Sequence, residues 1–380
     1  MKKILLIPDS FKGTMSSSEI CEIMRNSISS YYPKAEVISI PVADGGEGSV
    51  DSFLDAVGGE KVWLTVKGPF GENVKGFYGL LPDHTAVVEM AAAAGLPLVG
   101  EKKRVEKATT YGVGQLIKHA AETGCKKIIV GLGGSATNDG GTGAAEALGV
   151  RFLNTMGRPF LPVGETLCDI ASIDVSGITP ALEGVEFITM CDINNPLCGP
   201  QGAAAVFGPQ KGADATMVKK LDSNLAHLAE VIKKCLGKDI ADIAGAGAAG
   251  GMGGGMIAFL DSKLQMGIET VLDVVNFDSL LEGADLVISG EGKIDHQSLS
   301  GKVLIGVAHR SKKKAVPLIA VVGDIDDNIE EVYNEGVTAV FSINQKAISF
   351  EKAKLRCKRD LRLTVDNLMR LLSNGIINSR

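Results

Sequence analysis

The chain lacks the features that mark several large classes of protein. Only 5% of its 380 residues are aromatic, and no run of about 20 apolar residues could span a bilayer. The N-terminal apolar run ends at Pro8, which is too short for the hydrophobic segment of a signal peptide. We therefore expect a soluble, cytoplasmic protein with no membrane partner.

Cysteine, histidine and positive charge also lack the patterns that mark a disulfide framework, a metal site or a nucleic-acid-binding surface. The seven cysteines are scattered, odd in number and contain no CxxC pair, which argues against a disulfide framework or a structural zinc site. The five histidines show no metal-binding spacing. The net charge is −6 and no long basic run occurs, so we expect no nucleic-acid partner.

The common nucleotide-binding motifs are missing or incomplete. Lys302 is followed by Val303, so the Ser or Thr of a Walker A motif is absent. Residues 131–136 fit the G-x-G-x-x-A dinucleotide pattern. The acid expected about 20 residues later is missing, because 151–156 reads Arg-Phe-Leu-Asn-Thr-Met. A dehydrogenase is therefore a disfavoured alternative.

What the sequence does have is glycine, 47 residues of it, gathered with acids and lysines in four clusters. Glycine lets the backbone approach a ligand closely, and carboxylates and lysines beside such loops suit a magnesium-bound polyphosphate. We read the four clusters as a phosphate site assembled from distant segments; they are residues 9–13, 43–48, 133–141 and 290–295.

The hydrophobic pattern predicts two α/β domains. Short apolar runs followed by helical spacing recur at both ends of the chain and predict five parallel strands, at 3–8, 35–42, 286–289, 316–322 and 338–343. This suits a flavodoxin-like domain formed by 1–59 and 284–380, with 60–283 inserted as a second α/β domain. Within the insert we expect an antiparallel meander over 61–90, a strand at 126–131, a helix at 216–236 and a loop entering a helix at 245–255.

Ligands of open parallel sheets bind at the carboxyl ends of the strands, where three of the clusters lie. Lys12 and Lys293 could neutralise charge on a transferring phosphoryl group. Asp44, Glu291 and Asp295 are candidates to lie near magnesium or the substrate hydroxyl. Asp192 follows a predicted strand and could be a general base or a metal ligand, or form an Asx-turn before Pro196.

The third cluster has two interpretations. Ser135, Thr137, Asn138 and Asp139 offer hydroxyls, an amide and a carboxylate beside exposed N–H groups, which could cradle phosphate at a helix N-terminus. Alternatively, the same residues form a polar turn that only caps the helix.

Taken together, these stretches resemble the bacterial type of the glycerate kinase family. The match runs from about residue 3 to the last helix and includes Asp-Ser-Phe-Lys-Gly, Ala-Asp-Gly-Gly-Glu-Gly and Gly-Gly-Ser-Ala-Thr-Asn-Asp-Gly-Gly. The six ordered motifs lie at 8–13, 42–48, 133–141, 191–197, 206–212 and 290–295. The family's architecture, a flavodoxin-like domain plus an inserted domain, agrees with the division predicted above.

The resemblance implies phosphorylation of D-glycerate with ATP and Mg²⁺, giving 2-phosphoglycerate in most bacterial members and 3-phosphoglycerate in others. It favours an active site in the cleft between the two domains, whose closure would exclude water. A monomer or a homodimer is expected. The alternatives are a kinase for another small hydroxy acid such as tartronate, and a non-catalytic protein that binds a small acid or a nucleotide.

The resemblance also yields the candidate site. We expect Asp192 or Asp44 to accept the hydroxyl proton, Lys12 and Lys293 to stabilise charge, and Asp44, Asp192 and Asp295 to hold the metal. The substrate- and phosphate-binding candidates are Asp9, Ser10, Gly45, Gly46, Glu47, Gly133, Gly134, Ser135, Thr137, Asn138, Asp139, Asn194, Gly290 and Glu291.

Two departures from the family pattern fall in the fourth cluster. Lys293 stands where arginine is expected, which keeps the charge but loses the bidentate fork. Residues 296–301 then read His-Gln-Ser-Leu-Ser-Gly in place of the more usual start Ser-Gln-Thr.

Overall fold

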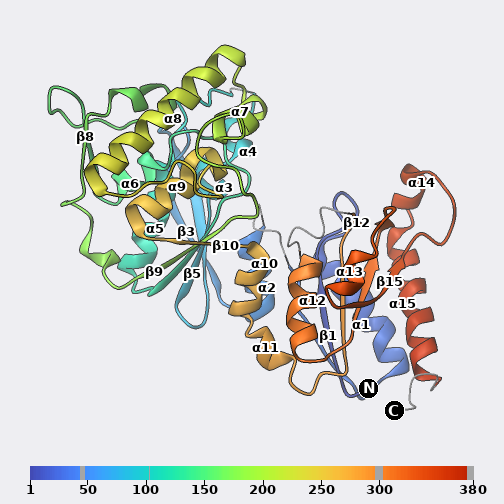
Figure 1. Ribbon diagram of the computed structural model, residues 1–380. Coiled ribbons are helices and arrows are strands. Elements are labelled where there is room, and N and C mark those ends of the chain that lie inside the picture. Colours follow the sequence, from blue (N-terminus) through green and yellow to red (C-terminus); the bar gives the residue numbers. More distant parts are fainter. Residues whose placement is uncertain (43–47, 102, 296–302, 375–380) are drawn as a thin grey trace. The chain divides into compact units, whose positions relative to one another are not determined.

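The computed structural model describes residues 1–42, 48–101, 103–295 and 303–374. The chain forms two compact units. Unit 1 comprises Met1–Asp44, Asp55–Val57 and Ile268–Arg380, and unit 2 comprises Gly45–Leu54 and Gly58–Gly267. Each unit has its own largely parallel sheet with helices (Figure 1), which confirms the predicted α/β fold class.

The sheet of unit 1 joins the two ends of the sequence. It has five strands in the order β15-β13-β11-β1-β2, and every neighbouring pair is parallel. Numbered along the chain this is the order 2-1-3-4-5 of flavodoxin-like sheets. The five strands predicted from the sequence are confirmed as β1 (Lys3–Pro8), β2 (Glu36–Ser39), β11 (Leu286–Gly290), β13 (Leu318–Val322) and β15 (Val337–Ser342).

Helices cover both faces of this sheet because its strands are apolar on both faces. α1 and α15 pack together with Ile4, Leu6 and Ile288 on one face, and α12 packs on the other. A capping box formed by Ser16 and Glu19 begins α1. The helices and short strands are α1 (Ser17–Tyr31), α10 (Gly267–Val274), α11 (Phe277–Leu280), β12 (Lys293–Ile294), α12 (Val303–Lys313), β14 (Asp324–Ile325), α13 (Glu331–Asn334), α14 (Phe350–Lys354) and α15 (Cys357–Ser373).

The predicted domain limits, 1–59 with 284–380 and 60–283, stay a prediction. In the structure the C-terminal part of unit 1 begins at Ile268, so that α11 and nearly all of α10 belong to unit 1. There the guanidinium of Arg310 in α12 binds Glu269, Asp273 and Asp278, with N–O distances of 2.6, 2.6 and 3.0 Å. These ion pairs hold both helices against α12.

The sheet of unit 2 has six strands in the order β10-β9-β6-β5-β4-β3. The strands β3, β4 and β5 form the predicted antiparallel meander, and β5, β6, β9 and β10 are parallel. The strands are β3 (Glu60–Lys67), β4 (Asn73–Leu80), β5 (Thr85–Glu89), β6 (Lys127–Gly131), β9 (Glu186–Met190) and β10 (Lys263–Gln265), with a separate pair β7 (Arg151–Leu153) and β8 (Ser172–Asp174).

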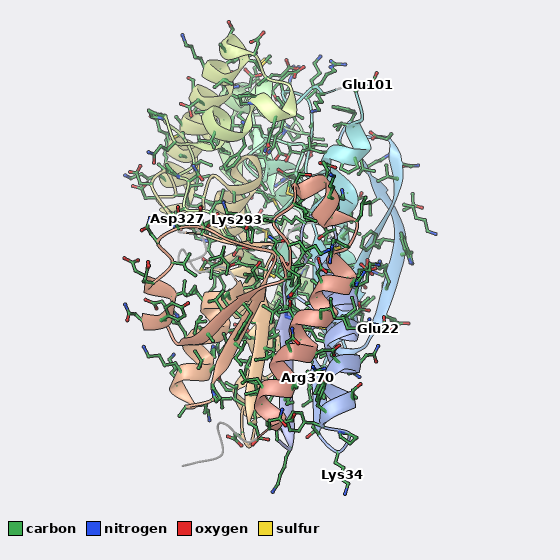
Figure 2. All side chains as sticks on the ribbon, turned by 90° about the vertical axis from the view of Figure 1, so that its right-hand side faces the viewer. Glu22, Lys34, Glu101, Lys293, Asp327 and Arg370 are labelled. Atoms are coloured by element: carbon green, nitrogen blue, oxygen red, sulfur yellow. The ribbon has the colours of Figure 1, made fainter. Side chains whose placement is uncertain are left out.

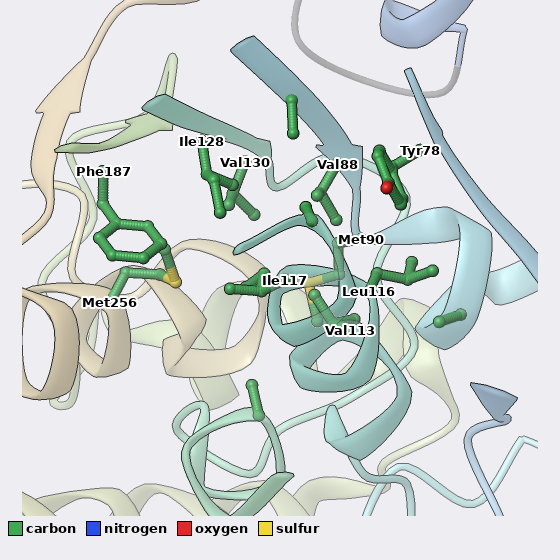
Figure 3. Close-up of a cluster of buried hydrophobic side chains, with 14 of the residues drawn as sticks. Tyr78, Val88, Met90, Val113, Leu116, Ile117, Ile128, Val130, Phe187 and Met256 are labelled. Carbon is green, nitrogen blue, oxygen red and sulfur yellow. The ribbon is translucent and has the colours of Figure 1, made fainter. Parts of the chain in front are cut away.

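Two apolar cores stabilise unit 2. In the first, Val113, Leu116 and Ile117 of α5 pack on Val88 of β5 and Val130 of β6 (Figure 3). The second lies beneath α8. The helices are α2 (Ser49–Val57), α3 (Ala91–Ala94), α4 (Leu96–Val99), α5 (Tyr111–Glu122), α6 (Thr142–Ala147), α7 (Ala203–Phe207), α8 (Ala215–Leu236) and α9 (Ala248–Leu260), with the 3-10 turns η1 (Gly164–Asp169), η2 (Pro180–Leu182) and η3 (Pro209–Lys211).

The glycine tract at the start of α9 behaves as predicted, as a loop entering a helix. Ala249, Gly250 and Gly251 have positive φ angles and form a kink before the regular helix begins. Within the described ranges, no helix combines the length and the apolar character needed to cross a membrane.

Candidate active site

The first and fourth clusters lie side by side in unit 1. They follow β1 and β11, which are neighbours paired from Ile4↔Leu286 to Pro8↔Gly290. The backbone N–H of Asp9 donates to the carbonyl of Gly290 over 2.8 Å. The strand order reverses at this pair, which is where open α/β sheets bind their ligands.

The loop after β1 is a tight turn that presents Lys12. Phe11 and Met15 are both buried, and the N–H of Phe11 donates to the carbonyl of Met15 over 2.9 Å. Between them Lys12 and Gly13 are exposed, and Gly13 takes the left-handed φ of +75°. Asp9 and Ser10 are half-buried at the base, where an oxygen of Asp9 accepts from the N–H of Ser10.

The glycines of the fourth cluster permit close backbone contacts. A Cβ on Gly290 would lie 2.0 Å from the carbonyl oxygen of Val321, and one on Gly292 would lie 3.4 Å from the backbone nitrogen of Lys12. Glu291, between these two glycines, is buried, with 4% of its surface exposed. The absence of a side chain thus lets Gly290 lie close to β13 and lets Gly292 lie close to the loop of Lys12.

Lys293 lies among carboxylates at the same edge. Its Nζ is 3.0 Å from Oδ2 of Asp326, and both side chains are about half exposed. Hydrogen bonding to Asp326 and the charges of Asp326, Asp324 and Asp295 raise the pKa of Lys293, so it is cationic at neutral pH. Figure 2 shows Lys293 and Asp327 at one end of the unit 1 sheet and Lys34, which precedes β2, at the other.

The third cluster follows β6 in unit 2, and most of its polar side chains are buried. Ser135 is 6% exposed, whereas Thr137, Asn138 and Asp139 are fully buried. The exposed part of the loop is Gly134, with Gly133 half-buried beside it. The polar side chains of this loop therefore face the interior of unit 2.

Asp139 holds the loop to two neighbouring segments. Its Oδ2 accepts from the N–H and the hydroxyl of Thr110, over 2.7 and 2.8 Å. Its carboxylate also accepts from the N–H groups of Gly141 and Gly143. Burial raises the pKa of Asp139, and these four donors oppose that rise. This favours the capping interpretation for Asp139.

Lys211 is a component that the sequence analysis missed. Its side chain is buried, and Nζ donates to Oγ of Ser135 over 2.7 Å and to the carbonyl of Thr137 over 2.8 Å. Burial lowers the pKa of Lys211 to about 7, while the charge of Asp139 acts in the opposite direction. The sequence did contain a signal for Lys211, because it lies in the motif 206–212 that supported the family resemblance. No role was assigned to the residues of that motif.

Asp192 and Asn194 follow β9, the neighbour of β6 in the sheet. Gly131 pairs with Met190 at the ends of these strands, so both loops start at one edge. Asp192 is exposed, and its Oδ1 accepts from the N–H of Gly267, the first residue of α10, over 2.8 Å. Asn194 is also exposed.

The candidates Asp44, Gly45, Gly46 and Glu47 lie outside the described residues, as do 296–302. The structure does describe Gly48 and Val50, which follow the second cluster. Oε1 of Glu89, a buried residue at the end of β5, accepts from the N–H of Val50 over 2.6 Å. Burial raises the pKa of Glu89.

A metal site was also predicted. Across the described ranges, no group of three His, Cys, Asp or Glu side chains is placed to hold a metal ion. Magnesium in kinases needs only one or two carboxylates together with substrate phosphates. Asp295, half-buried in unit 1, and Asp192, exposed in unit 2, are suitable single carboxylates.

The described candidate residues thus fall into two groups, one in each unit. Asp9, Ser10, Lys12, Gly290, Glu291, Lys293 and Asp295 lie at the carboxyl edge of the unit 1 sheet, and Gly133, Gly134, Ser135, Thr137, Asn138, Asp139, Asp192 and Asn194 lie in unit 2. An active site between the domains stays a prediction.

Comparison with known proteins identifies the family. The model of the glycerate kinase family matches residues 4–373. The Bacillus subtilis (strain 168) "Glycerate kinase" is 47% identical over 353 residues, 92% of each chain, and the Escherichia coli (strain K12) "Glycerate 2-kinase" is 45% identical over 343 residues, 90% of each.

A solved structure agrees. The crystal structure of "putative glycerate kinase 2" from Salmonella typhimurium LT2 matches with a TM-score of 0.88 and 41% identity, over 98% of this chain and 99% of that one. These matches favour a kinase over the non-catalytic alternative. The chain is a phosphotransferase with an alcohol group as acceptor and belongs to the glycerate kinase family.

Proposed function

We propose that this enzyme transfers the γ-phosphoryl group of ATP to D-glycerate, with Mg²⁺, and that the product is 2-phosphoglycerate. The observation that carries the proposal is the family match over residues 4–373. The choice of product follows the Escherichia coli relative named "Glycerate 2-kinase".

The loops of unit 1 suit the recognition of phosphate. Phosphoryl transfer depends mainly on positioning and on fixed charges near the developing negative charge. Lys12 is exposed at the tip of its turn, and Lys293 is cationic beside it in the sheet edge. We assign both lysines to stabilising charge as the phosphoryl group moves.

Asp192 suits the handling of the acceptor hydroxyl. Its hydrogen bond from Gly267 fixes the orientation of the carboxylate while the residue remains exposed. A carboxylate held in this way can orient a hydroxyl group and accept its proton during attack. Asp44, outside the described residues, remains the other candidate for this role.

The exposed backbone at Gly133 and Gly134 suits an anionic group of a substrate. Glycine allows an oxyanion to approach the backbone N–H groups closely. Two buried side chains hold this loop from within the unit: the Ser135 hydroxyl accepts from Lys211, and the Asp139 carboxylate accepts from Thr110.

Magnesium would be held by the carboxylates of Asp192, Asp295 and Asp44, in some combination with the phosphates of ATP. When bound, it would neutralise charge on the β- and γ-phosphate oxygens.

The test is release of ADP in a coupled assay with Mg²⁺ and a panel of D-glycerate, L-glycerate, glycolate, tartronate and glycerol. We expect turnover with D-glycerate, and phosphorus NMR should place the phosphate on the 2-hydroxyl. Preferred turnover of tartronate would show that D-glycerate is not the main substrate. A product phosphorylated on the 3-hydroxyl would show that the proposed 2-phosphoglycerate is wrong.

A further inference from the structure

Lys211 occupies a position that lysine seldom takes. It ends the turn η3 (Pro209–Lys211), and 3% of its surface is exposed. A buried ammonium is costly unless its donors find acceptors and an opposite charge lies near. Lys211 has both, since it donates to Ser135 and Thr137 and is attracted by Asp139.

The two acceptors of Lys211 are buried and come directly after Gly134, the exposed residue of the third cluster. On its other side this stretch, 134–137, is held by α3 and α4, because the N–H of Ala136 donates to Ala94 over 2.9 Å and that of Leu96 to Gly134 over 2.8 Å. Lys211 therefore completes a clamp around residues 134–137, and Gly134 is the exposed residue of that stretch.

The bonds made by Lys211 have a clear geometric consequence. Gly134 has a positive φ of 73°, so the backbone turns sharply just before Ser135. A shift of the Ser135 hydroxyl or the Thr137 carbonyl would change the direction of the N–H groups at this turn. Misplacement by about 1 Å can lower the rate of an enzyme on the order of 100-fold.

We propose that Lys211 is a positioning residue for phosphoryl transfer, which acts through Ser135 and Thr137 to hold the Gly133–Gly134 backbone where it binds an anionic group of a substrate. Lys211 itself is too buried to touch the ligand. This inference rests on the proposed function, in which the Gly133–Gly134 backbone binds an anionic group of a substrate.

The experiment uses the full-length enzyme, three single variants and one double variant. Lys211→Met keeps an unbranched side chain, one atom shorter, but removes its donors and charge. Ser135→Ala removes one acceptor. Lys103→Met is the matched control, because Lys103 donates to the carbonyl of Gln210 in the same turn over 3.0 Å but is exposed.

We expect Lys211→Met to lower kcat/KM at least 10-fold at a temperature where it is folded, with Lys103→Met within twofold of the wild type. The Lys211→Met/Ser135→Ala double variant should lose less than the product of the two single losses, because both act on one contact. Whether KM rises for ATP or for glycerate will distinguish a phosphate from a carboxylate at Gly133–Gly134.

Hydrogen exchange in peptides covering 132–138 provides a readout that does not need turnover. Exchange there should be faster in Lys211→Met than in the wild type and unchanged in Lys103→Met. A Lys211→Met enzyme with lowered thermal stability but wild-type kcat/KM and exchange would overturn the proposal. If Lys211→Met does not fold, Ser135→Ala decides, and wild-type kcat/KM and exchange in that variant would also overturn it.

These results separate the inference from the proposed function. Absence of glycerate turnover in the wild type would refute the substrate assignment alone. The exchange comparison between Lys211→Met and Lys103→Met would then decide the role of Lys211.

Discussion

At the scale of single residues, burial separates the candidates that can meet a substrate from those that cannot. Lys12, Asp192 and Lys293 are exposed, whereas Asp139 is fully buried and accepts from four donors. The sequence offered all four as site candidates, Asp139 for binding and the others for catalysis, because residue type and motif do not reveal burial. The exposed members therefore give the sharpest tests of chemistry.

Asp192→Asn should lower kcat about 100-fold or more, since general base catalysis contributes about 10²–10⁴-fold. The asparagine keeps an oxygen that can accept from Gly267, so folding should be preserved, as circular dichroism would check. Asp239→Asn removes an exposed carboxylate that pairs with Lys233 and is not a site candidate, so it should leave kcat unchanged. Undiminished kcat in a folded Asp192→Asn enzyme would remove Asp192 from the mechanism.

Lys293→Met should lower kcat/KM by about 10²-fold, the typical effect of removing one fixed group that stabilises a transition state. Lys293→Arg should retain most activity, because it keeps the charge near Asp326 and restores the residue expected in the family. Steady-state kinetics of both variants would check this. Equal losses in both would show that the ammonium geometry matters more than charge.

Lys211 should make stability depend on pH. Its pKa is about 7 in the folded protein against 10.5 for an ordinary lysine, so between these values the unfolded chain binds more protons. Stability therefore rises with pH in this window through Lys211. Urea unfolding from pH 7 to pH 9.5 should show this slope in the wild type relative to Lys211→Met; parallel curves would contradict the lowered pKa.

At the scale of elements, tight backbone contacts shape the loops. The Cβ of an alanine at Gly250, in the kink of α9, would lie 2.0 Å from the carbonyl of Thr137. Sequence composition correctly predicted a loop entering a helix at 245–255. It could not predict which loop would face it, because that depends on the packing of α9 against the third cluster.

Gly250→Ala should destabilise the enzyme more than Gly237→Ala. Both glycines have φ near +70°, but nothing lies within 4 Å of a Cβ at Gly237. The shared strain costs about 1–2 kcal/mol, and the clash adds to it only at Gly250. Urea unfolding gives both free energies; equal losses would mean that the Thr137 loop yields without cost. We also expect lower kcat/KM in Gly250→Ala alone.

At the scale of the whole molecule, the net charge of −6 makes localised cations necessary for anionic substrates. Lys12 and Lys293 supply them at the edge of unit 1. The predicted cytoplasmic location and the predicted monomer or homodimer stay predictions.

Saturating ATP with Mg²⁺ should raise the melting temperature, because ligand that binds only the folded state at about 100 times its Kd adds about 2.7 kcal/mol. ATP with EDTA should give a smaller shift, and EDTA should abolish turnover until excess Mg²⁺ is restored. Differential scanning calorimetry and the ADP assay measure both effects. Turnover undiminished by EDTA would contradict a magnesium requirement.

The sequence by itself determined the five strands of unit 1, the meander and the family, because each depends on local periodicity or on contiguous motifs. Only the tertiary structure decided that Lys211 enters the third cluster, that Asp326 pairs with Lys293 and that Asp139 faces inward. The first contact joins residues 76 positions apart. Such contacts follow from side-chain packing and desolvation, which no local pattern encodes.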